Sequence, residues 1–245
     1  MAIYPRFDGA DWRCVEDYAF TEGFSGAQWA WQFLRRNPRY QAEWRAFIAT
    51  WRALEQDYGR APNRDFCQWK NDPRAWVPAA ECGEGDCRID QDKVLIECAL
   101  GARWGFHKFP PDPAVRDAPG EGRLNWREAS FGPERLEAGE AVPDGAALAT
   151  LCFDLALPLK TQVEQAKRRL QLLQRQRVRD GRILAPKAVA HAEEWRRGIR
   201  MLDARAAGAT LEALRAVWPT RDVAADLDAA ERLRDGGYRR ITLLP

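Results

Sequence analysis

The feature that most restricts the fold is a run of large apolar side chains between residues 38 and 58. They recur at alternating steps of four and three residues: Tyr40, Trp44, Phe47, Trp51, Leu54 and Tyr58. This spacing places all six on one face of an α-helix, as in the seam of a coiled coil. The helix is predicted to begin at Pro38, because proline is tolerated in a first helical turn. The face needs a cover, which is either a helical hairpin within the chain or a partner; we favour the hairpin.

A shorter helix is predicted just before this seam, from Gly26. Trp29 and Phe33 fall on one face of it, and Arg35 and Arg36 lie near its end, where the helix dipole favours cations. The helix ends before Pro38, since the residue that precedes a proline is pushed out of the α conformation. Residues 1–59 are therefore predicted to form an aromatic-rich helical N-terminal region.

The next region, residues 60–158, differs in charge and in periodicity. Residues 61–159 carry 17 Asp and Glu against 11 Lys and Arg, and Pro and Gly interrupt them often. Three short apolar runs have the length and composition of strands: 93–100, 103–109 and 147–155. We predict a small, mostly antiparallel sheet domain here, so the fold class is α+β and mainly α.

Basic charge is concentrated in residues 160–200. This stretch holds twelve Lys and Arg against four Asp and Glu, although the whole chain has a net charge of only +2. Its first half predicts a helix over about 159–180, with a capping box formed by Thr161 and Glu164. An apolar stripe follows that helix at three- and four-residue steps: Val163, Ala166, Leu170 and Leu173.

Three further helices are predicted after the basic one, over about 188–207, 209–218 and 221–235. The first is expected to turn Trp195, Ile199, Leu202 and Ala206 inward and its arginines outward. The third is expected to bury Val223, Leu227, Ala230 and Leu233, and an extended tail follows over 238–244. This order of helices and tight turns is typical of helix-turn-helix modules. We therefore predict a basic helical DNA-binding domain over residues 159–245.

The cations of this domain are the candidate binding residues, because Lys and Arg release counterions from phosphates. The candidate DNA-binding residues are Lys167, Arg168, Arg169, Arg196, Arg197, Arg200, Arg221, Arg239 and Arg240. Arg221, at the start of the third helix, is expected to read bases, and Arg239 and Arg240 to anchor phosphates as a wing does. A solvated helix face is the alternative explanation of the charge run. The third helix itself is rich in Asp and Glu, which disfavours its insertion into a groove.

Four segments carry a resemblance to a known family: residues 29–40, 154–162, 200–214 and 236–239. Together they resemble the RovC-like bacterial transcriptional regulators, from the N-terminal regulator-like region to the C-terminal DNA-binding domain. The resemblance implies an activator that binds double-stranded DNA as a homo-oligomer and that works with RNA polymerase. It also implies that Gly208 makes a turn, that 211–214 begin the supporting helix, and that 236–239 close the domain. The irregular spacing of the six cysteines, without a secretion signal, indicates the cytoplasm of a bacterium.

Other classes of function find less support in the sequence. No nucleophile elbow or glycine-rich phosphate loop is present, so we expect no enzymatic activity and no cofactor. Cys82 and Cys87 have the spacing of zinc ligands, but no second close pair completes a site, and we expect no metal. The six cysteines are predicted to be reduced, and no apolar run is long enough for a membrane span. A protein-interaction or assembly subunit is the alternative to a DNA-binding regulator, with a nuclease-like enzyme third.

Overall fold

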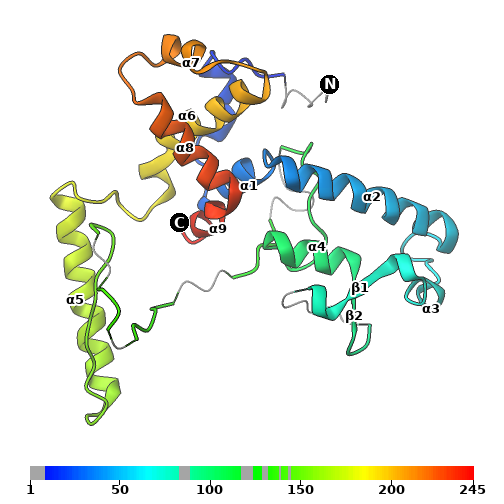
Figure 1. Ribbon diagram of the computed structural model, residues 1–245, viewed down its shortest axis with the longest axis horizontal. Helices are drawn as coiled ribbons and strands as arrows, with labels where there is room; N and C mark the ends of the chain where they lie inside the picture. The colour runs from blue at the N-terminus through cyan, green and yellow to red at the C-terminus, as the bar shows by residue number, and fades with distance from the viewer. Residues whose placement is uncertain (1–8, 83–88, 117–123, 129–131, 138, 143–144) are drawn as a thin grey trace.

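The computed structural model describes residues 9–82, 89–116, 124–128, 132–137, 139–142 and 145–245 (Figure 1). Over these residues the protein is mainly helical with one small antiparallel sheet, which confirms the predicted fold class. The predicted boundary between the segments 60–158 and 159–245 falls at the start of the long helix α5, Leu159–Arg179.

The N-terminal region contains one 3-10 helix and two α-helices: η1 (Glu16–Thr21), α1 (Gly26–Leu34) and α2 (Pro38–Tyr58). Ser25 caps α1 in a capping box with Gln28, which satisfies backbone N–H groups of the first turn. The Asn37 side chain accepts hydrogen bonds from the backbone N–H groups of Arg39 and Tyr40, so it ends one helix and caps the next. The helices predicted from Gly26 and from Pro38 are thus confirmed.

The seam of α2 is core, as the hairpin interpretation requires, but α1 is not its main cover. Tyr40, Trp44, Phe47 and Leu54 are buried, and α2 packs against α3 (Phe66–Trp69) and α4 (Ile96–Trp104). The ring of Trp51 lies edge-on to that of Trp69 at 4.8 Å, and the ring of Tyr40 lies edge-on to that of Trp104 at 5.4 Å. Such offset aromatic pairs contribute beyond the apolar area that they bury. The aromatic seam therefore needs no partner molecule.

The sheet is smaller than the sequence predicts. It consists of β1 (Trp76–Pro78) and β2 (Lys93–Leu95), with the 3-10 turns η2 (Pro73–Ala75) and η3 (Ala79–Glu81) on either side of β1. The strands are antiparallel, with Trp76 opposite Leu95 and Val77 opposite Val94. From Ile96 the predicted strand 93–100 is instead helix α4, because a short buried run does not distinguish strand from helix by its periodicity.

The other two predicted strands do not form ladders within the described residues. The stretch 103–109 completes α4 and leaves a single antiparallel bridge between Phe106 and Trp126. The stretch 147–155 pairs with no other strand and runs beside α5 (Figure 1). A strand needs a neighbour as well as a suitable composition, and composition alone does not identify that neighbour.

The C-terminal helices are α6 (Ala188–Ala206), α7 (Leu211–Val217), α8 (Val223–Arg232), the π-turn η4 (Leu233–Gly237) and α9 (Tyr238–Ile241). α8 packs against both α6 and α7. The predicted extended tail is wrong at its start, because Tyr238 and Ile241 are both buried, and their three-residue separation places them on one side of a helical turn. Ala206 is exposed at the end of α6, and Ala204 is buried instead.

One hydrophobic core joins the N-terminal and C-terminal helices. The ring of Trp29 on α1 meets that of Trp195 on α6 edge-on at 5.7 Å. α9 lies so close to α1 that a Cβ atom on Gly26 would overlap the carbonyl oxygens of Ile241 and Leu244. The Gly26 N–H also donates to the Leu244 carbonyl at 3.1 Å. Segments at opposite ends of the sequence therefore build a single packed unit.

The helix α5 stands apart from this unit, with the extended segment 145–158 beside it (Figure 1). No residue of α5 is buried. Arg177 Nη1 donates to the carbonyls of Ala146 and Leu148 at 2.8 and 2.6 Å, and Gln162 exchanges two hydrogen bonds of 2.9 Å with the backbone of Asp154. We call residues 145–179 the arm.

The capping box predicted at the start of α5 is absent. The helix begins two residues before Thr161, at Leu159, and Pro158 at the cap position makes no side-chain hydrogen bond. Gln162 instead holds the chain that leads into the helix, through the backbone of Asp154. The beginning of the helix thus depends on the extended segment of the arm.

Candidate DNA-binding surface

The basic cluster predicted on the long helix is exposed on the arm. Lys167, Arg168 and Arg169 occupy successive positions of α5, so their side chains spread around a large part of its circumference. Among the described residues, none of the three forms an ion pair with a carboxylate. The whole helix has seven Lys and Arg and one acidic residue, Glu164.

Further cations extend the cluster along the same helix. Arg175 lies seven residues after Arg168 and therefore shares its face, and Arg179 follows one turn later. Arg177 is different, because its guanidinium binds the carbonyls of the extended segment. The extended segment thus covers one side of α5 and leaves a stripe of Arg168, Arg175 and Arg179 in solvent.

The three arginines of α6 that were predicted to face outward, Arg196, Arg197 and Arg200, do not lie free in solvent. Arg200 is buried: its Nε donates to the Trp12 carbonyl at 2.9 Å and its Nη2 to the Arg13 carbonyl at 2.8 Å. Burial lowers the pKa of this guanidinium, and the Trp218 ring lies 5.0 Å from it. Arg196 donates from Nε to the Thr21 hydroxyl at 2.9 Å.

The prediction for these arginines failed because of tertiary contacts. Residues 12–21 cover the polar face of α6 and bind its arginines. The spacing of residues within the helix does not indicate that this face is covered. Long arginine stems pack well against apolar surface while their charged ends find carbonyls and hydroxyls. Arg196 and Arg200 therefore bind the N-terminal segment to α6.

Arg221 lies in the turn before α8 and is held by a carboxylate on that helix. Its Nε and Nη2 donate to the two oxygens of Asp226 at 3.0 and 3.1 Å, and Arg197 donates to the same carboxylate at 3.0 Å. The hydrogen bond from Arg221, with the charge of Arg197, lowers the pKa of Asp226. About half of the Arg221 side chain remains exposed.

The solvent face of α8 carries few free cations. Its exposed residues are Ala224, Ala225, Asp228 and Arg232, and the last two pair with each other. On α9, the guanidinium of Arg239 donates to the Arg103 carbonyl, and Arg240 is exposed. The predicted DNA-binding residues are thus divided between the arm and the packed unit, and the strongest exposed cluster is on the arm.

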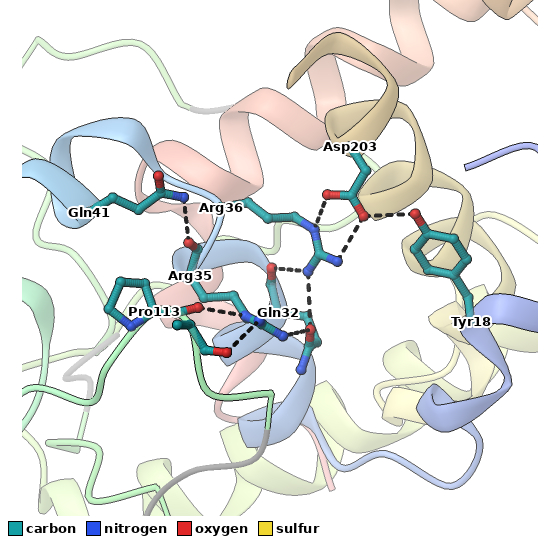
Figure 2. A network of polar contacts seen from close by, with 8 residues as sticks. Tyr18, Gln32, Arg35, Arg36, Gln41, Pro113 and Asp203 are labelled. Atoms are coloured by element: carbon teal, nitrogen blue, oxygen red, sulfur yellow. Dashed lines mark hydrogen bonds and ion pairs between the residues drawn. The ribbon is translucent and has the colours of Figure 1, made fainter. Parts of the chain in front are cut away.

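A buried polar network, which the sequence does not predict, joins α1 to α6 (Figure 2). Arg36 Nε and Nη2 donate to the two oxygens of Asp203 at 2.7 and 2.9 Å, and only 3% of the Arg36 side chain is exposed. The Tyr18 hydroxyl donates to the same carboxylate at 2.8 Å. Burial and the nearby Asp203 raise the pKa of Tyr18 far above its ordinary value, so the hydroxyl stays a donor.

The neighbouring arginine extends this network to the segment before residue 117. Arg35 is fully buried, and its Nε donates to the Pro113 carbonyl at 3.0 Å (Figure 2). Gln41 Nε2 donates to the Arg35 carbonyl at 2.9 Å, which satisfies the end of α1. The expectation that Arg35 and Arg36 serve only as cations near a helix end is therefore incomplete. The position of two adjacent arginines among large apolar residues could have indicated this network, because buried charges require partners.

Among the residues that the structure describes, no group of three or more His, Cys, Asp or Glu is placed to hold a metal ion. Cys87, half of the predicted zinc-like pair, lies outside the described residues. Cys98 is disulfide-bonded, so the expectation of six reduced cysteines is wrong for this residue, whereas Cys14, Cys67, Cys82 and Cys152 are free. No helix in the described ranges has the length and apolar character to cross a membrane.

Comparison with known proteins relates the N-terminal helices to transcription. Residues 11–69 match a family model described as the proteobacterial transcriptional regulator-like domain. No curated protein and no solved structure matches the chain. The matched stretch contains Tyr18 and Arg36, whose shared partner Asp203 lies far beyond it. The match supports a place among transcriptional regulators.

Proposed function

We propose that the protein is a DNA-binding transcriptional regulator of the RovC-like type, an activator that acts as a homo-oligomer in the bacterial cytoplasm. The match of residues 11–69 to a transcriptional regulator-like domain supports the regulatory role. The observation that carries DNA binding is the exposed basic cluster of Lys167, Arg168 and Arg169 on α5, which has no carboxylate partner in the described chain. An activator of this kind would also contact RNA polymerase.

The arm suits phosphate binding better than α8 does. α5 presents an excess of six positive charges over 21 residues, whereas the exposed charges of α8 are largely paired with each other. Unpaired cations along one helix attract the phosphate backbone and displace its condensed counterions, which gives affinity that depends steeply on salt. The arginines of α6 contribute indirectly, because they hold the unit to which the arm is attached.

The test is the salt dependence of DNA binding. Replacement of Lys167, Arg168 and Arg169 by Ala should weaken binding to every duplex and flatten the slope of log K against log salt by roughly 0.9 for each phosphate that is no longer neutralised. Replacement of Arg45, Arg52 and Arg60 by Ala, three cations outside the arm, changes the net charge equally and should leave the slope close to that of the wild type. If both triple variants behave alike, the cluster on α5 is a solvated helix face.

Sequence discrimination is proposed to come from the helix-turn-helix formed by α7 and α8, through Arg221. This residue is half exposed at the start of α8, where recognition helices reach base edges. It would exchange its bidentate contact with Asp226 for one with a base. Arg221→Ala should lose about 1–3 kcal/mol of the preference for a specific site over a scrambled duplex. Arg239→Ala and Arg240→Ala should weaken binding to the specific and the scrambled duplex equally if these residues anchor phosphates. If Arg221→Ala still discriminates between the two duplexes, another element reads the bases.

A second candidate function is a protein-interaction or assembly subunit without DNA binding. The observation that favours it is the apolar surface of the arm, which includes the exposed Leu155, Leu157 and Leu172. The same titration separates the two functions, because a subunit of this kind would not show DNA affinity that falls steeply with salt.

A further inference from the structure

The arm exposes an unusual amount of apolar surface. Nine large apolar side chains in residues 148–172 are exposed, out of nineteen among the described residues. The nine are Leu148, Leu151, Phe153, Leu155, Leu157, Leu159, Val163, Leu170 and Leu172. Single exposed leucines are ordinary, but a contiguous set on one element marks an interaction surface.

The central part of the extended segment also has unpaired backbone groups. Residues 147–155 have the composition of a strand, and between the turns at Ala147 and Leu155 they run along α5 without a neighbouring strand. From residue 149 to residue 153, no backbone N–H or C=O group has a hydrogen-bond partner within the described part of the chain. Such a row of free donors and acceptors is a template for another strand.

Charge favours contact through this segment over direct contact between two α5 helices. Asp154 is the only charged residue in 145–157, whereas the apolar stripe of α5 is flanked by Lys160, Lys167 and Arg169. Two α5 stripes facing each other would bring these like charges together, which is destabilising. Two copies of the extended segment would bring together uncharged residues, with the two Asp154 side chains at opposite ends of an antiparallel pair.

We propose that residues 149–153 pair antiparallel with the same residues of a second copy of this chain, about a two-fold axis near Leu151. In this arrangement the free backbone groups form an intermolecular ladder, and the α5 helices help to cover its apolar side chains. Each partner buries ~800 Å² in a standard interface, and the nine exposed side chains supply apolar surface for one. A two-fold axis makes such an interface self-complementary: if residue i of one copy contacts residue j of the other, residue j of the first also contacts residue i of the second.

This inference deepens the homo-oligomer of the proposed function and rests on that part alone, since it requires no DNA. Its test is the mass of the full chain in solution without DNA, measured by light scattering and sedimentation. We expect the wild type to be a dimer or a multiple of one. Thr150→Pro removes one N–H group at the centre of the ladder, where the single copy makes no hydrogen bond, and should reduce the mass at least two-fold. Thr150→Ser is the matched control and should keep the wild-type mass.

A second pair of variants tests the apolar contact. Leu155 is 83% exposed on the arm, and Val189 is 77% exposed on α6, so an aspartate at either position should leave the single copy folded. Leu155→Asp should reduce the mass at least two-fold, whereas Val189→Asp should not. In a Cys152→Ser background, Leu151→Cys should form a covalent dimer on mild oxidation, because antiparallel partners lie ~4.5–5.5 Å apart at Cα.

The outcomes distinguish this inference from the DNA-binding proposal. A monomeric wild type, or an unchanged mass in both Thr150→Pro and Leu155→Asp, would overturn the strand-paired dimer. A dimer that dissociates as expected but has no salt-dependent affinity for DNA would support the interface and overturn the DNA-binding function. If the apolar side of the arm contacts DNA and no second copy, the mass measured without DNA would be the same in the wild type, Thr150→Pro and Leu155→Asp.

Discussion

Glu97 lies on α4 with its side chain buried, and its Oε2 atom has no hydrogen-bond partner among the described residues. Burial raises the pKa of this carboxyl, although the charges of Lys108 and Arg64 oppose the shift. A carboxyl whose pKa is higher in the folded protein binds more protons there than in the unfolded chain. The free energy of unfolding should therefore fall as pH rises from the ordinary glutamate pKa through the raised one.

Glu97→Gln should remove this pH dependence. We expect the variant to unfold at higher urea concentration than the wild type at neutral pH, by about 1–3 kcal/mol, because the unpaired charge is gone. Below the ordinary pKa of glutamate, both proteins carry a neutral group and the difference should shrink. Urea titrations at several pH values from 4 to 8 measure this, and a gap between the two proteins that does not change with pH would contradict the assignment.

The ion pair of Arg36 and Asp203 joins segments that are 167 residues apart in sequence. Its removal from one side leaves a buried charge without its partner, so Asp203→Asn or Arg36→Met should each cost about 3–5 kcal/mol. The double variant should cost less than the sum of the two. Urea unfolding of all four proteins gives the coupling energy, and additive losses would show that the two groups do not act as a pair.

At the scale of single elements, the aromatic face of α2 is the clearest test of core packing. Trp44 is nearly buried against the main core, so Trp44→Ala should lower the free energy of unfolding by about 3–5 kcal/mol. Phe66, also aromatic, is half exposed on α3, and Phe66→Ala should change stability by no more than about 0.5 kcal/mol. A variant of Trp44 that keeps its stability but has a smaller mass in solution would show that this face is an interface after all.

The elements that follow from local spacing could be predicted from the sequence, and those that depend on distant neighbours could not. The four-and-three spacing of α2 and the apolar positions of α8 were sufficient, because a helix satisfies its backbone within itself. The predicted strand 147–155 has no partner strand among the described residues, and the run from residue 93 became mostly helix, because strand pairing is a property of two segments. Arg200 was expected in solvent for the same reason, since the carbonyls of Trp12 and Arg13 that bind it are 188 and 187 residues away.

At the scale of the whole molecule, the arm and the packed unit differ in how they are stabilised. The packed unit has a continuous core from Trp12 to Ile241, whereas α5 contributes no buried residue to it. Most of the stability of a helix in a protein comes from tertiary packing of its apolar face. The arm of a single copy should therefore unfold at lower urea concentration than the packed unit, and pairing with a second copy should move its transition upward.

This separation has an optical consequence. All eleven tryptophans lie at positions 12–126, 195 and 218, so the arm contains none. Tryptophan fluorescence thus follows the parts of the chain outside the arm, while circular dichroism in the far ultraviolet also records α5. In Thr150→Pro the two signals should give different urea midpoints of unfolding. In the wild type the two midpoints should come closer together as the protein concentration rises, because pairing stabilises the arm. Leu172→Trp would add a tryptophan to the arm, and the change in emission relative to the wild type would report contact between the arm and a second copy.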